Sequence, residues 1–180
     1  MLVAITSDIH NNLANLKKVL DYCNSKKIRK MICCGDLASL ETLDFLNDNF
    51  SGEIFYCFGN MDDDQMDQAF LSARGEMSLK DREMGKKYKN TLVFRKYGEI
   101  KIADKAIAFV HYPDKAKRLA ESGKYKFVFY GHTHKPWEET IGKCKMLNPG
   151  NVAGEIYLPT FAVWNTENNK FELIRIHNLT

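Results

Sequence analysis

Residues 127–134 read FVFYGHTH, an apolar run followed at once by Gly131, His132, Thr133 and His134. The apolar run predicts a short buried strand, and the two histidines lie just past its end, where the chain turns into a loop. Imidazole is the commonest metal-binding side chain, so a His-x-His pair in such a loop can aim both rings at one point. Taken alone, the pair fits two exposed loop histidines better than a metal site, and the rest of the chain has to separate these interpretations.

Four other apolar runs stop in the same way, at a residue whose side chain can bind a metal. They are Leu2–Thr6 followed by Asp8 and His10, Lys30–Cys34 followed by Asp36, Ile54–Phe58 followed by Asn60, and Lys105–Val110 followed by His111. Ligands of open α/β sheets bind at the carboxyl ends of the strands. Four of the five histidines in the chain lie at such ends, and only His177 does not.

Helical periodicity separates the first strands. Apolar residues at helical spacing predict helices over about 12–26, capped by Asn11 or Asn12, and over about 39–48. A third helix is predicted from Pro113 to about Ser122, closed by Gly123. Strands that alternate with helices predict an α/β fold with a largely parallel sheet.

The second half of the chain is richer in strands. Strands are predicted over 92–94, 99–102, 105–110, 126–130 and 145–147, followed by a turn at 148–151 and a hairpin of 160–165 with 170–176. Residues 63–90 interrupt the pattern and predict a short helix with an exposed excursion. Within that region the acidic triplet 62–64 is typical of a helix start, and the basic cluster 86–89 is typical of a solvated surface.

Composition sets the protein class. The 180 residues predict a single domain over 1–180, with 44% hydrophobic and 27% charged residues, as in ordinary globular proteins. A net charge of +3 gives no strong nucleic-acid signal, and no apolar run is long enough to cross a membrane. Neither a signal peptide nor a disulfide framework is evident, so we expect a cytoplasmic protein with five reduced cysteines.

Seven candidate metal ligands therefore come from five strand ends, as two carboxylates, one amide and four imidazoles. They are Asp8, His10, Asp36, Asn60, His111, His132 and His134. Seven ligands exceed what one ion needs, whereas two divalent metal ions that share a carboxylate would use them all. Nitrogen and oxygen donors without a thiolate favour Mn²⁺ as first choice, with Ni²⁺, Zn²⁺ or iron next and Mg²⁺ less suited.

The ordered motifs Asp8-x-His10, Gly35-Asp36, Gly59-Asn60-x-Asp62, His111 and Gly131-His132-Thr133-His134 resemble those of the calcineurin-like metallophosphoesterase superfamily. The small size and the turn at 148–150 are similar to its compact branch of YfcE-type phosphodiesterases. The resemblance implies a four-layer αββα sandwich with two mixed β-sheets.

The same resemblance implies how the ligands divide between the two metals. The implied set is Asp8, His10 and His134 at the first metal, Asn60, His111 and His132 at the second, and Asp36 bridging them.

The implied activity is hydrolysis of a small phosphodiester by a hydroxide that two metals activate, with Asn60, His111 and Asp62 as candidate catalytic residues. Two positions depart from the family. Met61 stands where many members carry a histidine that protonates the leaving group, and a thioether cannot do this. Tyr112 stands where the family has a glycine, and its ring would narrow the cleft, stack on an aromatic group of the substrate, or simply pack on the surface.

Other functions stay open. A phosphomonoesterase or nucleotidase would use the same ligands, and a non-catalytic scaffold such as the small retromer subunit shares the implied fold. A scaffold predicts eroded ligands, whereas all seven are present here. A nuclease is less favoured because the chain has no basic stripe. The expected partner is a small phosphoester, and assembly into a homo-oligomer is left open.

Overall fold

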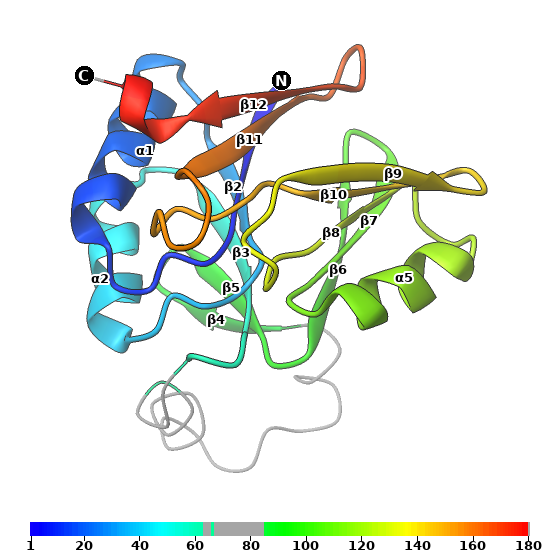
Figure 1. Cartoon of the computed structure of the whole chain (residues 1–180), viewed down its shortest axis with the longest axis horizontal. Helices are drawn as coiled ribbons and strands as arrows, with labels where there is room; N and C mark the ends of the chain where they lie inside the picture. Colours follow the sequence, from blue (N-terminus) through cyan, green and yellow to red (C-terminus); the bar gives the residue numbers. More distant parts are fainter. Residues whose placement is uncertain (63–65, 67–84, 180) are drawn as a thin grey trace.

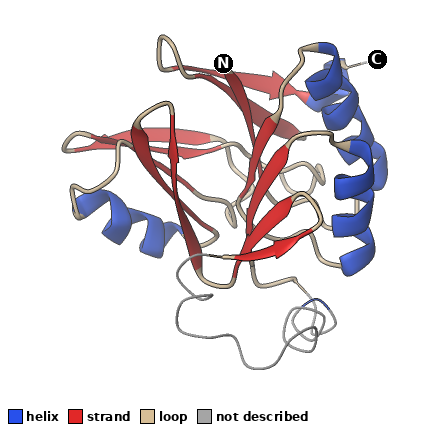
Figure 2. Ribbon diagram, turned by 180° about the vertical axis from the view of Figure 1, so that it is seen from behind, coloured by secondary structure: helices blue, strands red, loops and turns tan. Residues whose placement is uncertain are grey.

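Two β-sheets pack face to face, with helices on both outer faces. Figures 1 and 2 show the four layers in the computed structural model, which describes residues 1–62, 66 and 85–179. Helices α1 (Leu13–Ser25) and α2 (Leu40–Asn49) lie on one outer face, and α5 (Pro113–Glu121) lies on the other. The αββα sandwich implied by the sequence motifs is confirmed.

The larger sheet has seven strands among the described residues. In spatial order they are β12 (Lys170–Arg175), β11 (Thr160–Asn165), β1 (Leu2–Thr6), β2 (Lys30–Cys33), β3 (Glu53–Cys57), β5 (Thr91–Phe94) and β4 (Lys86–Tyr88). The run from β1 through β2 and β3 to β5 is parallel, and the other pairs are antiparallel, so the sheet is mixed.

The smaller sheet, in the part of the chain that the structure describes, has five strands and is also mixed. In spatial order they are β6 (Tyr97–Ile102), β7 (Lys105–Val110), β8 (Phe127–Phe129), β10 (Cys144–Asn148) and β9 (Trp137–Ile141). Strands β7, β8 and β10 run parallel to one another. A 3₁₀ turn, η1 (Ile176–Asn178), follows β12 near the C-terminus.

Three apolar clusters hold the layers together. The first lies between α1, α2 and the larger sheet, the second lies between the two sheets, and the third lies under α5. The middle cluster contains Trp164, Phe109 and Phe129, all fully buried. Burying side chains of this size contributes about 1.5–3 kcal/mol each, which fixes the two sheets against each other.

The predicted helix ends are confirmed to within a residue or two. The side chain of Asn12 accepts a hydrogen bond from the Asn15 N–H and caps α1, and Ser39 caps α2 in the same way. Pro113 begins α5, and Gly123 follows it with φ +70°. Residues 63–65 and 67–84, where a short helix and an exposed excursion were predicted, lie outside the described residues.

Two strands were missed in the sequence. Residues 86–88, from the basic cluster 86–89, form β4, a three-residue strand at the edge of the larger sheet, rather than only a solvated surface. Strand β9 is nearly all exposed, so its sequence lacks the apolar alternation that marks a strand. The sequence also indicated a turn around Gly98, between the strands predicted over 92–94 and 99–102, but Gly98 lies inside β6 and pairs with Phe109 of β7.

Strand register explains why the site forms at one edge. Thr6 of β1 pairs with Cys33 of β2, and Cys33 pairs with Tyr56 of β3, so these parallel strands end level with one another. In the smaller sheet Phe109 of β7 pairs with Phe129 of β8. The loops that follow all five strands therefore leave the sandwich from the same edge.

Candidate metal centre

All seven predicted ligands lie in these loops, and the structure brings them together. Asp8 and His10 come from the β1–α1 loop, Asp36 from the β2–α2 loop and Asn60 from the segment after β3. His111 stands between β7 and α5, and His132 and His134 lie after β8. Backbone hydrogen bonds join the loops: the N–H of His10 donates to the Asp36 carbonyl, and that of Gly131 donates to the His111 carbonyl.

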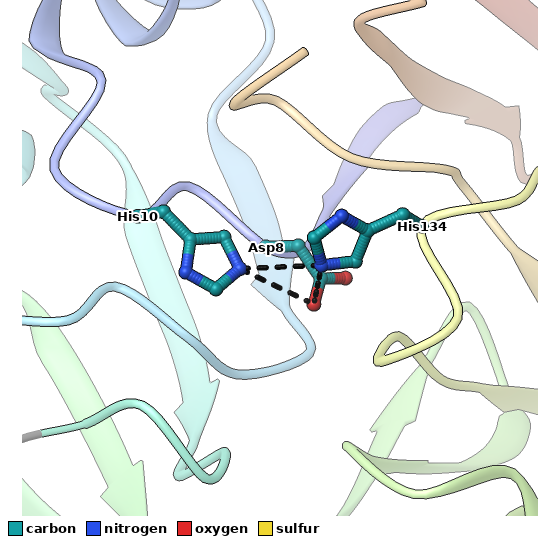
Figure 3. A group of neighbouring side chains, drawn as sticks. All are labelled: Asp8, His10 and His134. Carbon is teal, nitrogen blue, oxygen red and sulfur yellow. Dashed lines mark hydrogen bonds and ion pairs between the residues drawn. The ribbon is translucent and has the colours of Figure 1, made fainter. Parts of the chain in front are cut away.

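Asp8, His10 and His134 form the first cluster, drawn in Figure 3. The Nε2 atoms of the two histidines are 3.3 Å apart, and both face Oδ1 of Asp8, at 3.4 Å from His134 and 3.9 Å from His10. Ligands of one ion, each about 2.0–2.2 Å from it, lie about 2.8–3.6 Å from one another, depending on the coordination geometry. The donor atoms of this cluster are therefore spaced nearly as a shared ion requires.

Asn60, His111 and His132 form the second cluster. Oδ1 of Asn60 is 3.0 Å from His111 Nε2 and 2.9 Å from His132 Nδ1, and those two nitrogens are 3.3 Å apart. His132 faces the cluster through Nδ1, whereas His111 uses Nε2. The spacing again matches that of atoms around one ion.

Asp36 lies between the clusters. Its Oδ2 atom is 3.2 Å from His111 Nε2 in the second cluster and 3.8 Å from His10 Nε2 in the first. The other oxygen, Oδ1, accepts a hydrogen bond from the backbone N–H of Met61. One oxygen is thus held by the protein, and the other faces both clusters.

Hydrogen bonds behind the ligands orient the rings. Nδ1 of His111 lies 2.8 Å from the Cys34 carbonyl, and Nδ1 of His134 lies 3.2 Å from the Glu155 carbonyl. Because a carbonyl only accepts, each Nδ1 carries the proton and each Nε2 of the neutral ring presents a lone pair to the centre. Lone pairs that converge on carboxylate and amide oxygens fit a metal cation.

The pKa values reflect this convergence. Burial by itself would raise the pKa of Asp8, but hydrogen bonding to His10 and His134 outweighs it, and the pKa lies below its ordinary value. The Asp8 carboxylate raises the pKa of both histidines. Burial by itself would lower the pKa of His111, but the neighbouring Asp36 outweighs burial, and the pKa lies above its ordinary value. The carboxylates thus draw positive charge into the site.

The backbone is strained at most of the ligands. Five of the seven have a positive φ, a region that non-glycine residues seldom adopt: Asp8 (53°), His10 (46°), Asp36 (56°), His132 (69°) and His134 (58°). Such conformations cost about 1–3 kcal/mol each and cluster at functional sites, where the surrounding structure imposes them. No sequence pattern identified this strain.

Glycines before the ligands let the loops approach closely. A Cβ on Gly59 would overlap the Asp36 carboxylate, and a Cβ on Gly131 would overlap the hydroxyl of Ser7 and come within 2.7 Å of Asp8 Oδ2. These glycines, which the motifs contain, are therefore required by space and not by a positive φ.

Two buried asparagines were missed as supports of the site. Asn148 donates to the carbonyl of Gly131 and to Thr133, and Asn151 donates to the carbonyl of His134. Both lie in the turn predicted at 148–151, so the turn was recognised but its role in holding the His132–His134 loop was not.

Asp62 is committed to the backbone. Its carboxylate accepts hydrogen bonds from the N–H groups of Asp36, Ala38 and Gly59, and it thereby ties the β2–α2 loop to the segment after β3. Burial raises its pKa. A catalytic role for Asp62 stays a prediction, and its contacts are those of a residue that positions Asp36.

Comparison with known proteins identifies the family. The model of the calcineurin-like phosphoesterase superfamily domain matches residues 1–169. The chain belongs to this superfamily. The identification made from the ordered Asp, Asn and His motifs is thereby confirmed.

Relatives span the whole chain. Phosphodiesterase MJ0936 of Methanocaldococcus jannaschii is 26% identical over 176 residues, which are 97% of this chain and 98% of that protein. The structure of an archaeal phosphodiesterase has a TM-score of 0.78 at 23% identity and covers 97% of this chain and 99% of its own. YfcE, a phosphoesterase from E. coli, has a TM-score of 0.63 at 16% identity, over 98% of this chain and 100% of its own.

No helix in residues 1–62, 66 and 85–179 is both long and apolar enough to cross a bilayer.

Proposed function

We propose that this protein is a metal-dependent phosphodiesterase that hydrolyses small phosphodiesters with two divalent cations. The observation that carries the proposal is the position of Asp36 Oδ2 between two clusters of donor atoms. A carboxylate oxygen so placed suits two ions that share one ligand. Two such ions would stabilise both the attacking and the leaving oxygen when a phosphoester is hydrolysed. The relation to phosphodiesterase MJ0936 supports the same reaction.

The donors divide as the family resemblance implies. Asp8, His10 and His134 would hold one ion and Asn60, His111 and His132 the other, with Asp36 bridging. When bound, the ions would supply Lewis acidity and a water of lowered pKa at neutral pH. The two carboxylates leave about two positive charges uncompensated, which attract an anionic phosphoester.

Among the described residues, neither Ser7 nor any of the cysteines is suited to act as a nucleophile beside Asp8. Ser7 is buried and donates its hydroxyl hydrogen bond to the Cys34 carbonyl, and the five cysteines are all buried and free. Burial raises the pKa of Cys33 to about 12 and that of Cys34 well above its ordinary value, so neither is a thiolate at neutral pH. These observations favour direct attack by water without a covalent intermediate.

Met61 bears on the choice of substrate. Its backbone N–H holds Asp36, while its side chain is 53% exposed and carries no transferable proton. Leaving groups that need protonation are therefore disfavoured. Esters whose leaving group departs without an acid, such as aryl diesters, are favoured.

Mn²⁺ is the cation we propose first, because imidazole and carboxylate donors without thiolate suit it, and Zn²⁺, Ni²⁺ or iron would fit the same donors. Free, buried cysteines support a cytoplasmic location.

Metal removal and restoration test the function. After a chelator has removed the metal, the protein should no longer hydrolyse bis(p-nitrophenyl) phosphate, and added Mn²⁺ should restore the activity. The Mn²⁺-loaded protein should hydrolyse the monoester p-nitrophenyl phosphate more slowly than this diester. A faster rate on the monoester would favour a phosphomonoesterase or nucleotidase, and cleavage of DNA or RNA would favour a nuclease. Two bound ions without activity on any phosphoester would favour the scaffold.

A further inference from the structure

An aromatic ring lies beside the second cluster. Tyr112 follows His111, and its ring centroid is 5.1 Å from that of His111 and 5.1 Å from that of His132. Tyr112 is also the N-cap residue of α5, yet its side chain makes no capping hydrogen bond. The ring therefore packs against the two histidines of the second cluster. A substituent of a phosphoester that extends past His132 on this side would meet it.

Lys115 connects this ring to a pocket. Its Nζ atom lies 4.5 Å from the centroid of Tyr112, and the same side chain lines a pocket of about 270 Å³. The pocket opens between the start of β6 and helix α5, and Val110, which immediately precedes His111, forms part of its wall. It is lined by Lys96, Tyr97, Val110, Lys115, Arg118 and Leu119.

The lining combines apolar surface with positive charge. Tyr97, Val110 and Leu119 supply the apolar surface, and Lys96, Lys115 and Arg118 surround it. None of these three cations forms an ion pair with a carboxylate among residues 1–62, 66 and 85–179. The acidic residue of the first turn of α5, Asp114, is exposed. A ligand with an aromatic body and its own negative charge would complement both features.

We infer that Tyr112, Lys115 and this pocket form the subsite for one arm of the substrate, and that this arm is a nucleoside phosphate. The inference rests on the proposed function, because it takes the scissile phosphorus to lie at the metal centre. The base of the nucleoside fills the apolar pocket, and Lys96, Lys115 and Arg118 face the anionic groups of the ligand. Whole drug-sized ligands occupy pockets of about 300–1,000 Å³, so a pocket of about 270 Å³ suits one ring system and not a long acyl chain.

Competition by three phosphates tests the subsite. With the Mn²⁺-loaded protein, 5′-AMP should inhibit diester hydrolysis at least about tenfold more strongly than ribose 5-phosphate, since contact of one base with aromatic and cationic side chains supplies a difference of this size. Tyr112→Gly and Leu119→Glu should bring the two inhibition constants within about twofold. The inhibition constant for inorganic phosphate should stay within twofold in both variants. Tyr112→Phe should keep the preference for 5′-AMP.

The charge is tested separately. Lys115→Gln should weaken inhibition by 5′-AMP more than inhibition by ribose 5-phosphate. Lys117 is an exposed lysine of the same helix outside the pocket, and Lys117→Gln should change neither inhibition constant. Equal inhibition by 5′-AMP and ribose 5-phosphate in the wild type would overturn the inference, as would a preference that survives both Tyr112→Gly and Leu119→Glu. If no phosphoester is hydrolysed, the proposed function fails. Calorimetric binding of 5′-AMP and ribose 5-phosphate to the same variants then decides the subsite.

Discussion

The two clusters of the candidate metal centre, which form its two halves, differ in their access to solvent. In the first cluster Asp8 is fully buried, His134 is 8% exposed and His10 is half-buried. In the second, His111 is fully buried, but Asn60 and His132 are exposed. The bridging candidate Asp36 is 2% exposed. One half is therefore closed by the protein, and the other opens to solvent beside Tyr112.

The difference in burial predicts different roles for the two halves. Ligands that are buried and oriented by further hydrogen bonds bind an ion more tightly than exposed ones. We expect the first half to hold its ion tightly and the second half to exchange its ion and receive the substrate.

Replacing Asp36 removes the group that the two halves share. Asp36→Asn should weaken the binding of both ions and lower the rate of diester hydrolysis. Losing a residue that only supports a ligand costs about 10–100-fold, and the loss in Asp36→Asn should be larger. Elemental analysis and steady-state kinetics would measure both effects. Asp104→Asn, at a side chain that is 96% exposed, is the matched control and should match the wild type. Loss of only one ion in Asp36→Asn would show that Asp36 does not bridge.

Single histidine replacements separate the halves. His134→Ala should perturb the tightly bound ion, and His132→Ala should remove the exchangeable one and leave the other in place. Titration of Mn²⁺ into each metal-free variant would show which binding step is lost. His177→Ala, at an exposed histidine outside the centre, should bind like the wild type. If both variants lose the same step, the two rings bind one ion and the division between halves is wrong.

Adding a methyl group to Gly131 or Gly59 should disturb the candidate metal centre at two different places. Gly131→Ala would press on Ser7 and Asp8 in the first half, and Gly59→Ala would press on Asp36. Each should cost about 1–3 kcal/mol in the free energy of unfolding and weaken metal binding. Gly142→Ala adds its methyl group to open space at φ +59°, so thermal unfolding should show lower stability with unchanged metal affinity. Normal metal binding in Gly59→Ala and Gly131→Ala would contradict the close approach.

The smallest effect concerns the leaving group. Met61→His should raise hydrolysis of alkyl monoesters, whose leaving group needs protonation, roughly tenfold relative to hydrolysis of aryl diesters. This gain is below the about 10²–10⁴-fold that a well-positioned general acid supplies. Met61→Gln keeps a polar side chain without a transferable proton and should leave the ratio unchanged. Kinetics that are unchanged on both ester classes in Met61→His would show that position 61 does not reach the leaving group.

Much of the fold follows from local sequence signals. Buried strands such as Leu2–Thr6 and capped helices such as Leu13–Ser25 carry apolar periodicity that survives in the folded chain. Strand β9 does not, because its side chains face solvent and its position comes from pairing with β10. Its location depends on tertiary structure and could not be predicted from its own residues.

The site was predictable as a set of residues but not as a geometry. The order of Asp, Asn and His at strand ends identified the candidate ligands, and the register of the sheets explains why they meet. The positive φ of His132 and the support of Asn148 depend on contacts between distant loops. A sequence motif records which residues are present, whereas these contacts exist only once both sheets have packed.

The central claim is that two ions act together across Asp36. The most direct test titrates Mn²⁺ into the metal-free protein and follows bound metal and hydrolysis of bis(p-nitrophenyl) phosphate in the same samples. We predict two ions per chain, the first bound more tightly, with hydrolysis appearing only as the second binds. Full hydrolysis with one ion per chain, or a protein that binds only one ion, would contradict the account.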